Sequence, residues 1–236
     1  MNIKADLHTH TDASIDGRQT LRELLAAAKK RGLDAIAVTD HNYFQALPKE
    51  EEILLIPGCE FSTDEGHITG LFLEEAPMVK PMQTAAQAID EIHRCGGIAV
   101  LAHPYQKVFE RTVPQGIDAI ETANARAPYK YKGANILAYA LADENKLPGV
   151  GGSDAHSIHE VGNAYTEITA QEKTLPALKA AILRGECRGY CKRETALSKI
   201  GLSQFARRRR MGGIKNLCIG LLFLLIYSIK GVFKCR

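Results

Sequence analysis

The stretch Asp6-Leu7-His8-Thr9-His10, followed by Thr11-Asp12-Ala13-Ser14-Ile15-Asp16, organises the rest of the chain. Residues two apart in an extended strand point to the same side, so the imidazoles of His8 and His10 can converge on one point. Residues 1–5 are typical of a short strand, and residues 12–17 are rich in turn formers. An H-x-H pair alone is weak evidence for a metal, and its weight depends on whether similar residues recur at other strand ends.

Beyond this stretch, apolar runs of strand length alternate with amphipathic helical patterns about seven times. We expect strands near residues 34–41, 53–62, 67–73, 98–102, 117–121, 147–150 and 164–168, and helices near residues 21–31, 83–95, 133–144 and 175–184. This succession predicts βαβ units with a largely parallel, buried sheet. Polar residues collect at the C-terminal ends of the strands, where barrels and open sheets of this class have their active sites.

Nine candidate metal ligands follow strands or lie at their ends: His8, His10, Asp16, His41, Glu60, His67, His103, Asp154 and His156. Imidazole nitrogens and carboxylate oxygens suit Zn²⁺, Mn²⁺ or Fe²⁺ better than Ca²⁺. Nine donors exceed what one ion needs, so we expect two or three adjacent ions, and a carboxylate such as Glu60 can bridge two of them. Asp6 and Asp40 are expected to be hydrogen-bond acceptors or turn formers beside the ligands. The glycine pair 151–152 is expected to allow close backbone packing there.

Four motifs in this order resemble those of the PHP (polymerase and histidinol phosphatase) family of metal-dependent phosphoesterases. The motifs are Asp6-Leu7-His8-Thr9-His10, Thr39-Asp40-His41, His103-Pro104 and Ser153-Asp154-Ala155-His156. The similarity covers about residues 3 to 190. It implies an α/β fold, a distorted (β/α)₇ barrel, which the alternation of strands and helices also allows.

The resemblance implies a role for each donor. It places His8, His10, Glu60 and Asp154 around one metal, Glu60, His67 and His103 around a second, and Asp16, His41 and His156 around a third. It also implies that catalysis depends on His8, His10, Glu60, His103, Asp154 and His156, acting through metal-bound water. Asp16 stands where other members have histidine, and some members take the ligand at His67 from a later position. Both departures keep a competent donor.

The expected chemistry follows from the ions. A divalent ion lowers the pKa of its bound water from about 15.7 toward 7, so hydroxide is available at neutral pH for in-line attack on phosphorus. Neighbouring ions stabilise the charge on the phosphoryl oxygens. Arg126 and Asn124, at a strand end, are candidates for substrate binding, and Arg126 could clamp a phosphate with its planar guanidinium. A surface ion pair explains this arginine equally well. No residue stands out as the leaving-group acid.

Length, charge and cysteine content indicate the size of the domain, its binding partners and its location. With 236 residues, 45% hydrophobic and 24% charged, the chain suits one sizeable domain with an appendage. Residues 1–200 carry 22 Lys or Arg against 27 Asp or Glu, a balance of −5 that argues against an extended nucleic-acid surface. The six cysteines form no C-x-x-C pair, and no signal-peptide pattern opens the chain, so we expect reduced thiols and a cytoplasmic location. Cys187 and Cys191 could share a helix face.

The C-terminal residues differ from the rest in composition. We expect the barrel over residues 1–198 and a basic, apolar tail over residues 199–236. The tail joins the cluster Arg207–Arg210 to a charge-free apolar run of thirteen residues, Leu217–Ile229. A spanning helix needs about 20 residues, which residues 214–233 reach only by including Lys215 and Lys230. The tail is therefore a short membrane anchor, an interfacial helix, or a helix packed against the barrel or a partner subunit. Contact with the cytoplasmic face of a membrane is favoured.

Three functions are compatible with these patterns. The first is metal-dependent hydrolysis of a phosphate ester, a small-molecule or nucleotide phosphomonoester, at a two- or three-metal site. The second is a 3′–5′ exonuclease-type phosphodiesterase like the PHP modules attached to DNA polymerases, which the acidic barrel and the missing polymerase body disfavour. The third is a non-catalytic, metal-stabilised binding module, which should have lost some ligand positions, whereas every position is filled here.

Overall fold

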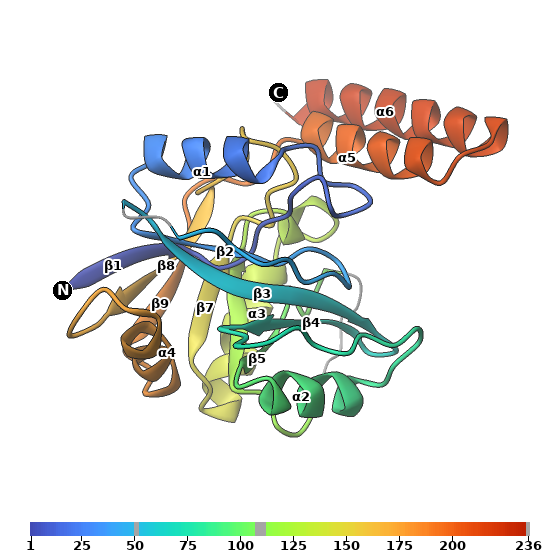
Figure 1. Ribbon diagram of the computed structural model, residues 1–236. Coiled ribbons are helices and arrows are strands. Elements are labelled where there is room, and N and C mark those ends of the chain that lie inside the picture. Colours follow the sequence, from blue (N-terminus) through green and yellow to red (C-terminus); the bar gives the residue numbers. More distant parts are fainter. Residues whose placement is uncertain (50–51, 107–111, 235–236) are drawn as a thin grey trace.

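The computed structural model describes residues 1–49, 52–106 and 112–234. Its centre is a nine-stranded sheet with the order β7-β6-β5-β4-β3-β2-β1-β8-β9 (Figure 1). The strands are β1 (Asn2–Asp6), β2 (Ala35–Val38), β3 (Leu54–Thr63), β4 (Gly66–Leu71), β5 (Ile98–Leu101), β6 (Ala119–Asn124), β7 (Gly149–Gly152), β8 (Ala164–Thr169) and β9 (Cys187–Cys191). The helices are α1 (Leu21–Lys30), α2 (Ala85–Arg94), α3 (Ala134–Asn145), α4 (Leu175–Leu183), α5 (Leu197–Arg210) and α6 (Ile214–Lys234), with a short 3₁₀ turn at Ala127–Tyr129.

The sheet curves into a nearly closed barrel, which confirms the predicted fold class. Strands β1, β2 and β3 pair in parallel, as do β5, β6 and β7, while β3–β4, β4–β5, β1–β8 and β8–β9 pair antiparallel. The two ends of the sheet meet because β7 also contacts β8 and β9. Beyond the strand ends, the Asp154 amide donates to the His8 carbonyl at 2.8 Å and the His10 amide to the Ala155 carbonyl at 2.9 Å. The segments that follow β1 and β7 are therefore held side by side.

The helices begin where the sequence predicts them. Thr20 and Thr84 each cap a helix in a capping box, with Glu23 and Gln87 returning the bond to the cap backbone. The apolar faces of α1 and α2 are buried against the sheet, as their periodicity predicts. Strands β2 and β5 are buried along their whole length, which explains their uninterrupted apolar sequences.

Two features of the sheet differ from the prediction. Strand β4 follows β3 through a tight turn, as the adjacent predicted strands indicate, but it pairs antiparallel with both β3 and β5, so the sheet is less parallel than predicted. Strand β9 was not predicted, and the suggestion that Cys187 and Cys191 share a helix face is wrong because both lie on this strand. No residue of β9 is buried, so the strand needs no alternating apolar side chains. Its sequence therefore lacks the alternation by which a strand is recognised.

A helical hairpin formed by α5 and α6 follows the barrel (Figure 1). Its turn contains Gly212 and Gly213, both left-handed at φ +73° and +79°. The helices pack closely at two other glycines, because a Cβ at Gly201 would lie 2.9 Å from the Tyr227 Cβ and one at Gly220 would lie 3.1 Å from Phe205. The helical C-terminal region is thus confirmed, and the predicted boundary at residue 198 falls in the first turn of α5. Residues 235 and 236 of the predicted tail lie outside the described residues.

Candidate metal centre

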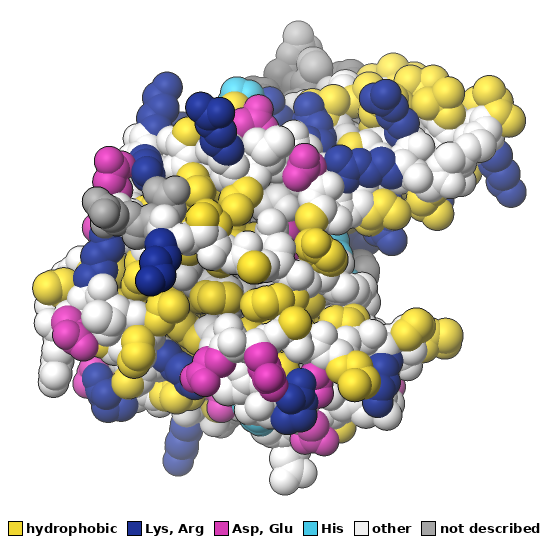
Figure 2. Space-filling view, in the orientation of Figure 1, with side chains coloured by type: hydrophobic (Ala, Val, Ile, Leu, Met, Phe, Trp, Pro, Cys, Tyr) yellow, Lys and Arg dark blue, Asp and Glu magenta, His cyan; other side chains and the backbone are white. Residues whose placement is uncertain are grey.

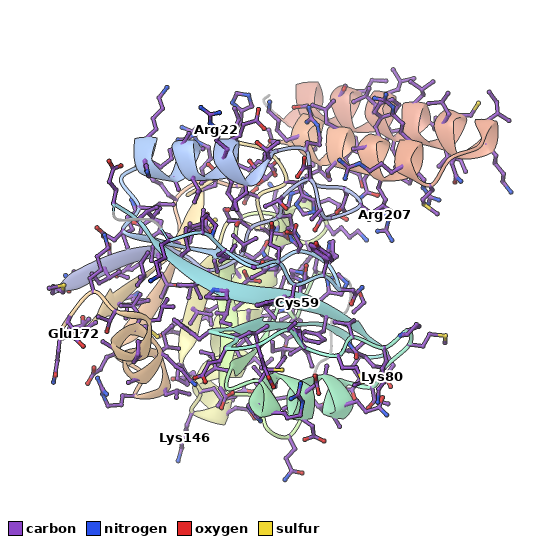
Figure 3. The ribbon with its side chains drawn as sticks, in the orientation of Figure 1. Arg22, Cys59, Lys80, Lys146, Glu172 and Arg207 are labelled. Atoms are coloured by element: carbon purple, nitrogen blue, oxygen red, sulfur yellow. The ribbon has the colours of Figure 1, made fainter. Side chains whose placement is uncertain are left out.

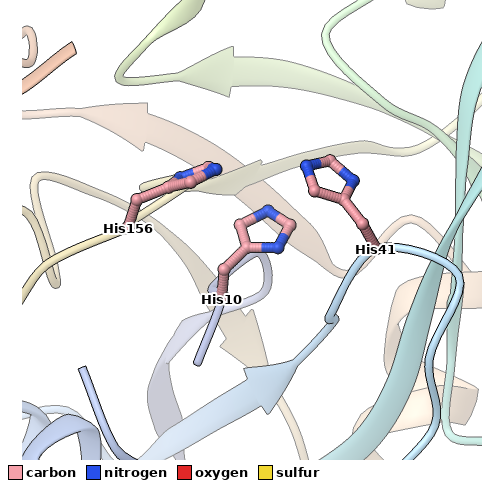
Figure 4. Close-up of side chains that lie close together, drawn as sticks. All are labelled: His10, His41 and His156. Carbon is pink, nitrogen blue, oxygen red and sulfur yellow. The ribbon is translucent and has the colours of Figure 1, made fainter. Parts of the chain in front are cut away.

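All nine predicted donors lie in one connected cluster. Strands β1, β2, β5 and β7 end beside it, Glu60 lies within β3, and His67 lies near the start of β4, so residues far apart in the sequence meet. The rings of His10 and His156 are 4.3 Å apart between centroids, and those of His10 and His41 are 4.5 Å apart (Figure 4). Imidazoles packed this closely repel one another when protonated, and the carboxylates among them offset that repulsion.

Glu60 lies at the centre of the cluster and is fully buried. Its two oxygens contact five imidazoles, Oε2 lying 3.3 Å from His8 Nε2, 3.3 Å from His10 Nε2 and 2.9 Å from His41 Nδ1, and Oε1 lying 2.7 Å from His67 Nδ1 and 3.1 Å from His103 Nε2. Each oxygen therefore faces its own set of nitrogens. This is the arrangement that a bridging carboxylate needs.

The two aspartates complete the cluster on the side away from His67. Asp154 Oδ1 lies 3.3 Å from His10 Nε2 and 3.4 Å from His156 Nδ1. Asp16 Oδ1 lies 3.3 Å from His156 Nε2 and 3.7 Å from His41 Nε2. Asp16 thus stands among imidazoles from two other segments, as the third predicted ligand set requires.

Within the part of the chain that the structure describes, four overlapping groups of donor atoms are compact enough to hold an ion, with all atoms of a group within 4.8 Å of one another. The groups are His8, Glu60 and His103; His8, His10 and Asp154; His41, Glu60 and His67; and His10, His41 and His156. Because Glu60 and three of the histidines each belong to two groups, the geometry suits neighbouring ions that share ligands. The assignment of each ligand to one ion stays a prediction.

The donors fit divalent metals by their chemistry and their bonding. The atoms His8 Nε2, His10 Nε2, Asp16 Oδ1 and Glu60 Oε2 are buried and make no hydrogen bond among the described residues. A buried polar atom without a partner costs about 1–3 kcal/mol, so four of them in one cluster need compensation. Coordination by a divalent cation supplies it, and a mixture of nitrogen and carboxylate donors suits Zn²⁺, Mn²⁺ or Fe²⁺.

The close packing of carboxylates and imidazoles shifts their pKa values. Burial alone would raise the pKa of Glu60, but the imidazoles of His41, His67 and His8 hold it well below its usual range. Burial would lower the pKa of His41, but the Glu60 carboxylate raises it to about 9. For His10, burial and the neighbouring His156 and His41 lower the pKa to about 4. The Glu60 carboxylate is therefore ionised at neutral pH and suited to binding cations.

Glu121 is the functional residue that the sequence analysis missed. It is buried in β6, where its Oε1 lies 3.0 Å from His8 Nδ1 and its Oε2 accepts from the His103 amide at 2.8 Å and from Asn124 Nδ2 at 3.0 Å. Because a carboxylate only accepts, His8 Nδ1 must donate, which leaves Nε2 as the free ligand atom. A charged residue within a buried strand that leads to the site was the signal that could have identified it.

Other polar residues hold the ligands in place. Asp40 accepts hydrogen bonds from the Thr11 amide and from the Ser14 hydroxyl, and Asp6 accepts from the Ser153 amide at 2.8 Å. The Ser14 hydroxyl lies 3.1 Å from His10 Nδ1. Neither aspartate faces the cluster of donors, which agrees with the supporting roles predicted for them.

The backbone is constrained at three positions beside the donors. His103 and Asp154 have φ of +28° and +53°, a left-handed region that costs a residue with a side chain about 1–3 kcal/mol. Gly152 lies so close to β1 that an added Cβ would be 2.6 Å from the His8 amide nitrogen. This close approach is the packing role predicted for the glycine pair.

A cavity of about 220 Å³ opens onto the cluster. Its lining includes Asp16, His41, His67, His103, Asp154 and His156 on the metal side, Arg126, Tyr129 and Lys130 after β6, and Ile200, Gln204, Arg207, Phe223 and Tyr227 from the α5–α6 hairpin. Figure 2 shows the hollow between the hairpin and the barrel. The hairpin thus forms one wall of the cavity.

The two predicted substrate-binding residues already have partners. Arg126 lines the cavity, but its Nε donates to Glu160 at 2.8 Å and its Nη2 to the Ser203 hydroxyl of α5 at 2.9 Å. The Asn124 side chain accepts from the Arg126 amide at 2.8 Å and donates to Glu121. These bonds tie the hairpin to the barrel and fix Glu121, and contact with substrate stays a prediction for both residues.

Comparison with known proteins gives several relatives of similar sequence. The chain is 33% identical to an uncharacterized protein of Methanocaldococcus jannaschii over 52% of this chain and 82% of that protein, and 30% identical to another from the same organism over 71% of each. It is 26% identical to a probable phosphatase of Shewanella sediminis, over 69% of this chain and 82% of that protein.

Solved structures share the fold. The crystal structure of a two-domain protein from Bacteroides vulgatus, which contains a predicted PHP-like metal-dependent phosphoesterase, superposes with a TM-score of 0.64 at 22% identity. That match covers 80% of this chain and 65% of the Bacteroides protein, so this chain spans somewhat less than two thirds of it. PsfC from Pseudomonas syringae superposes with a TM-score of 0.61 at 19% identity, over 89% of this chain and 98% of PsfC.

Family patterns match the barrel in two consecutive parts. The pattern of the PHP domain matches residues 6–131, and the PHP-associated pattern matches residues 132–187. The first match contains seven of the nine donors, and the second contains Asp154 and His156. Together with the clustered donors and the barrel, these matches show that the chain belongs to the PHP domain family.

Proposed function

We propose that the protein hydrolyses a phosphate monoester, of a small molecule or a nucleotide, at a centre of two or three divalent metal ions. The observation that carries the proposal is Glu60, whose two oxygens face separate sets of imidazoles in the middle of nine donors. Adjacent ions that share a carboxylate are suited to phosphoryl chemistry, because they activate water and neutralise the charge that develops on the phosphate. The probable phosphatases among the relatives support the same reaction class.

The side chains of the protein then have positioning roles. His8, His10, Glu60, His103, Asp154 and His156 hold the ions, and the remaining donors Asp16, His41 and His67 complete the ligand sets. Glu121 keeps His8 in the tautomer whose Nε2 can bind metal. Most of the donors are buried, which strengthens the electrostatic interactions of this centre.

Two cations at the cavity suit the ester's phosphate. Lys130 and Arg207 line the cavity with the metal ligands, and both are exposed at its rim. Figure 3 shows Arg207 on the underside of α5. Its guanidinium makes no hydrogen bond or ion pair with another described residue, which leaves its in-plane N–H donors for a phosphate or for a second anionic group of the substrate.

The cavity also bears on the choice between monoester and nucleic acid. The chain is 39% identical to a 5′-3′ exoribonuclease of Salmonella typhimurium, over 30% of this chain and 28% of that protein. A cavity of about 220 Å³ with the hairpin as one wall suits a small ester or a strand end better than an internal phosphodiester. The balance of −5 in residues 1–200 adds to the case for a small substrate.

Phosphate release from a panel of monoesters, nucleotides and a short RNA tests the proposal. We expect release from monoesters with added Mn²⁺, none after chelation, and a loss of at least about 100-fold in His8→Ala and Asp154→Ala. The control is His93→Ala, because His93 pairs with Asp118 at 2.7 Å on the outer surface. Activity that survives chelation and both substitutions would refute the metal mechanism, and faster cleavage of the RNA would make the protein a nuclease.

A further inference from the structure

The outer face of α6 carries a row of exposed apolar side chains. Seven of its side chains are between 36% and 77% exposed: Ile214, Leu217, Leu221, Leu222, Leu225, Ile226 and Ile229. Figure 2 shows these hydrophobic side chains gathered over the hairpin. At helical spacing they form one continuous stripe along the helix. Scattered exposed leucines need no explanation, but a stripe of this length indicates a binding surface.

The opposite face of α6 is already occupied. Leu224 and Tyr227 pack on Gly201 of α5, and Phe223 and Tyr227 line the cavity. The helix therefore has one side committed to the protein and one side that nothing described covers. The stretch Ile214–Gly231 is long and apolar enough to cross a membrane, with a mean hydropathy of 1.6 and 6% of it buried.

Charge indicates what the stripe binds. Residues 201–236 contain eight Lys or Arg and no Asp or Glu, against a balance of −5 in residues 1–200. Lys215 and Lys230 lie near the two ends of the stripe, and Arg209 is exposed on the neighbouring helix. A cationic apolar helix on an acidic body is complementary to an anionic lipid surface, which attracts the hairpin and repels the barrel.

Packing also decides how the helix would lie. Helix α5 runs along α6 and carries Arg207–Arg210 in its last turn, so it cannot enter hydrocarbon. Arg210 Nη1 donates to the Asp12 carbonyl at 3.1 Å and also to the Ser14 carbonyl, and Arg126 donates to Ser203, so α5 is fixed to the barrel. To span a bilayer, α6 would have to leave both α5 and the cavity wall.

We propose that α6 docks along the surface of an anionic lipid bilayer through its outer apolar stripe, while its inner face remains the wall of the catalytic cavity. One helix then contacts both the lipid and the space where substrate binds. Phosphate esters that are themselves held at a bilayer would be concentrated beside this cavity. The surface is independent of the metal centre, so the proposal can be tested without any hydrolysis.

A single introduced tryptophan gives the most direct test, because the chain has no tryptophan of its own. We would place it in the full-length protein at Leu225, which is 58% exposed on the stripe, and in a control at Ile136, which is 73% exposed on α3. Vesicles of phosphatidylcholine and phosphatidylglycerol in equal parts should shift the emission of Leu225→Trp to shorter wavelength and leave that of Ile136→Trp unchanged. No shift at Leu225, or an equal shift at both positions, would overturn the proposal.

Brominated lipids then locate the helix in the bilayer. Bromine near the headgroups should quench Leu225→Trp more strongly than bromine at the chain ends, because a docked helix lies near the interface. Stronger quenching from the chain ends would show that α6 spans the bilayer and would refute surface docking. Blue emission from a dimer before vesicles are added would instead assign the stripe to a second copy of the chain.

Sedimentation with vesicles measures the two components of binding separately. Leu222→Glu should weaken binding by about tenfold or more, because it places a charge in the apolar stripe. Lys215→Gln and Lys230→Gln should each weaken it by about fivefold, and only with anionic vesicles. Ile136→Glu is the matched control and should bind as the unmodified protein does. Equal binding to vesicles of phosphatidylcholine alone would overturn the proposed preference for an anionic bilayer.

Discussion

Replacing Glu121 by glutamine should weaken metal binding without disturbing the fold. The carboxylate accepts three hydrogen bonds, from His8 Nδ1, the His103 amide and Asn124 Nδ2. A glutamine of the same shape keeps one oxygen and presents an NH₂ group at the other position. At least one of the three donors must then face another donor.

The magnitude follows from which donor loses its acceptor. If the NH₂ group replaces Oε2, two buried N–H groups are left unpaired, at about 1–3 kcal/mol each. If it replaces Oε1, only His8 is affected, and the imidazole can reverse its tautomer to accept the new donor. The second arrangement costs less, but it puts a proton on Nε2, the atom that faces Glu60. We therefore expect about 10–100-fold weaker binding of metal.

A Mn²⁺ titration followed by competition with a chelator measures this change. Asp118→Asn is the matched control, because Asp118 directly precedes β6 and accepts from His93 Nε2 and the Ala99 amide, both at 2.7 Å, away from the centre. It should bind Mn²⁺ as the native protein does. If Glu121→Gln also binds within about twofold of the native protein, and its circular dichroism is unchanged, the tautomer argument is wrong.

Three further outcomes are expected. Gly152→Ala should lower the free energy of unfolding by about 1–3 kcal/mol in urea titrations, because its Cβ would lie 2.6 Å from the His8 amide nitrogen; unchanged stability would show that the strands can separate. Metal uptake should release protons and tighten as the pH rises toward 9, because Glu121 and Glu60 raise the pKa of His8 well above its usual value despite burial, and Glu60 raises that of His41 to about 9. Binding heats that do not depend on the buffer's ionisation enthalpy would contradict this. Ser203→Val should cost about 1–3 kcal/mol, because the buried Arg126 guanidinium loses an acceptor, and should speed proteolysis of the hairpin; equal cleavage rates would show that the hairpin is held elsewhere.

The barrel and its donors were predictable because each signal is local. An H-x-H pair after a strand, a histidine after an apolar run and an acid before a turn can be recognised without knowing the partners of each residue. The general rule that parallel strands present their C-terminal ends together then places such residues near one another. Glu60 and His103 fit this rule, and they are 3.1 Å apart in the structure.

Features that depend on tertiary contacts were harder to predict. Strand β9 forms because β8 offers an edge, and its own sequence contains no buried position. Glu121 lies within β6, and although a charged residue in a buried strand is a signal, its partner His8 can be identified only in the folded structure. The tail was predicted from composition alone, so its contact with the cavity through Phe223 and Tyr227 was not foreseen.

The hairpin contributes to the wall of the cavity but supplies none of the predicted metal ligands. The family match ends at residue 187, and the nine donors all precede it, whereas five residues of the cavity wall follow it. Substitutions in the last forty residues can therefore remodel the shape and charge of the cavity without touching a metal ligand. Descendants of this chain could change the specificity of the proposed reaction through the hairpin alone, and exchanging the hairpin between relatives is a practical way to test this.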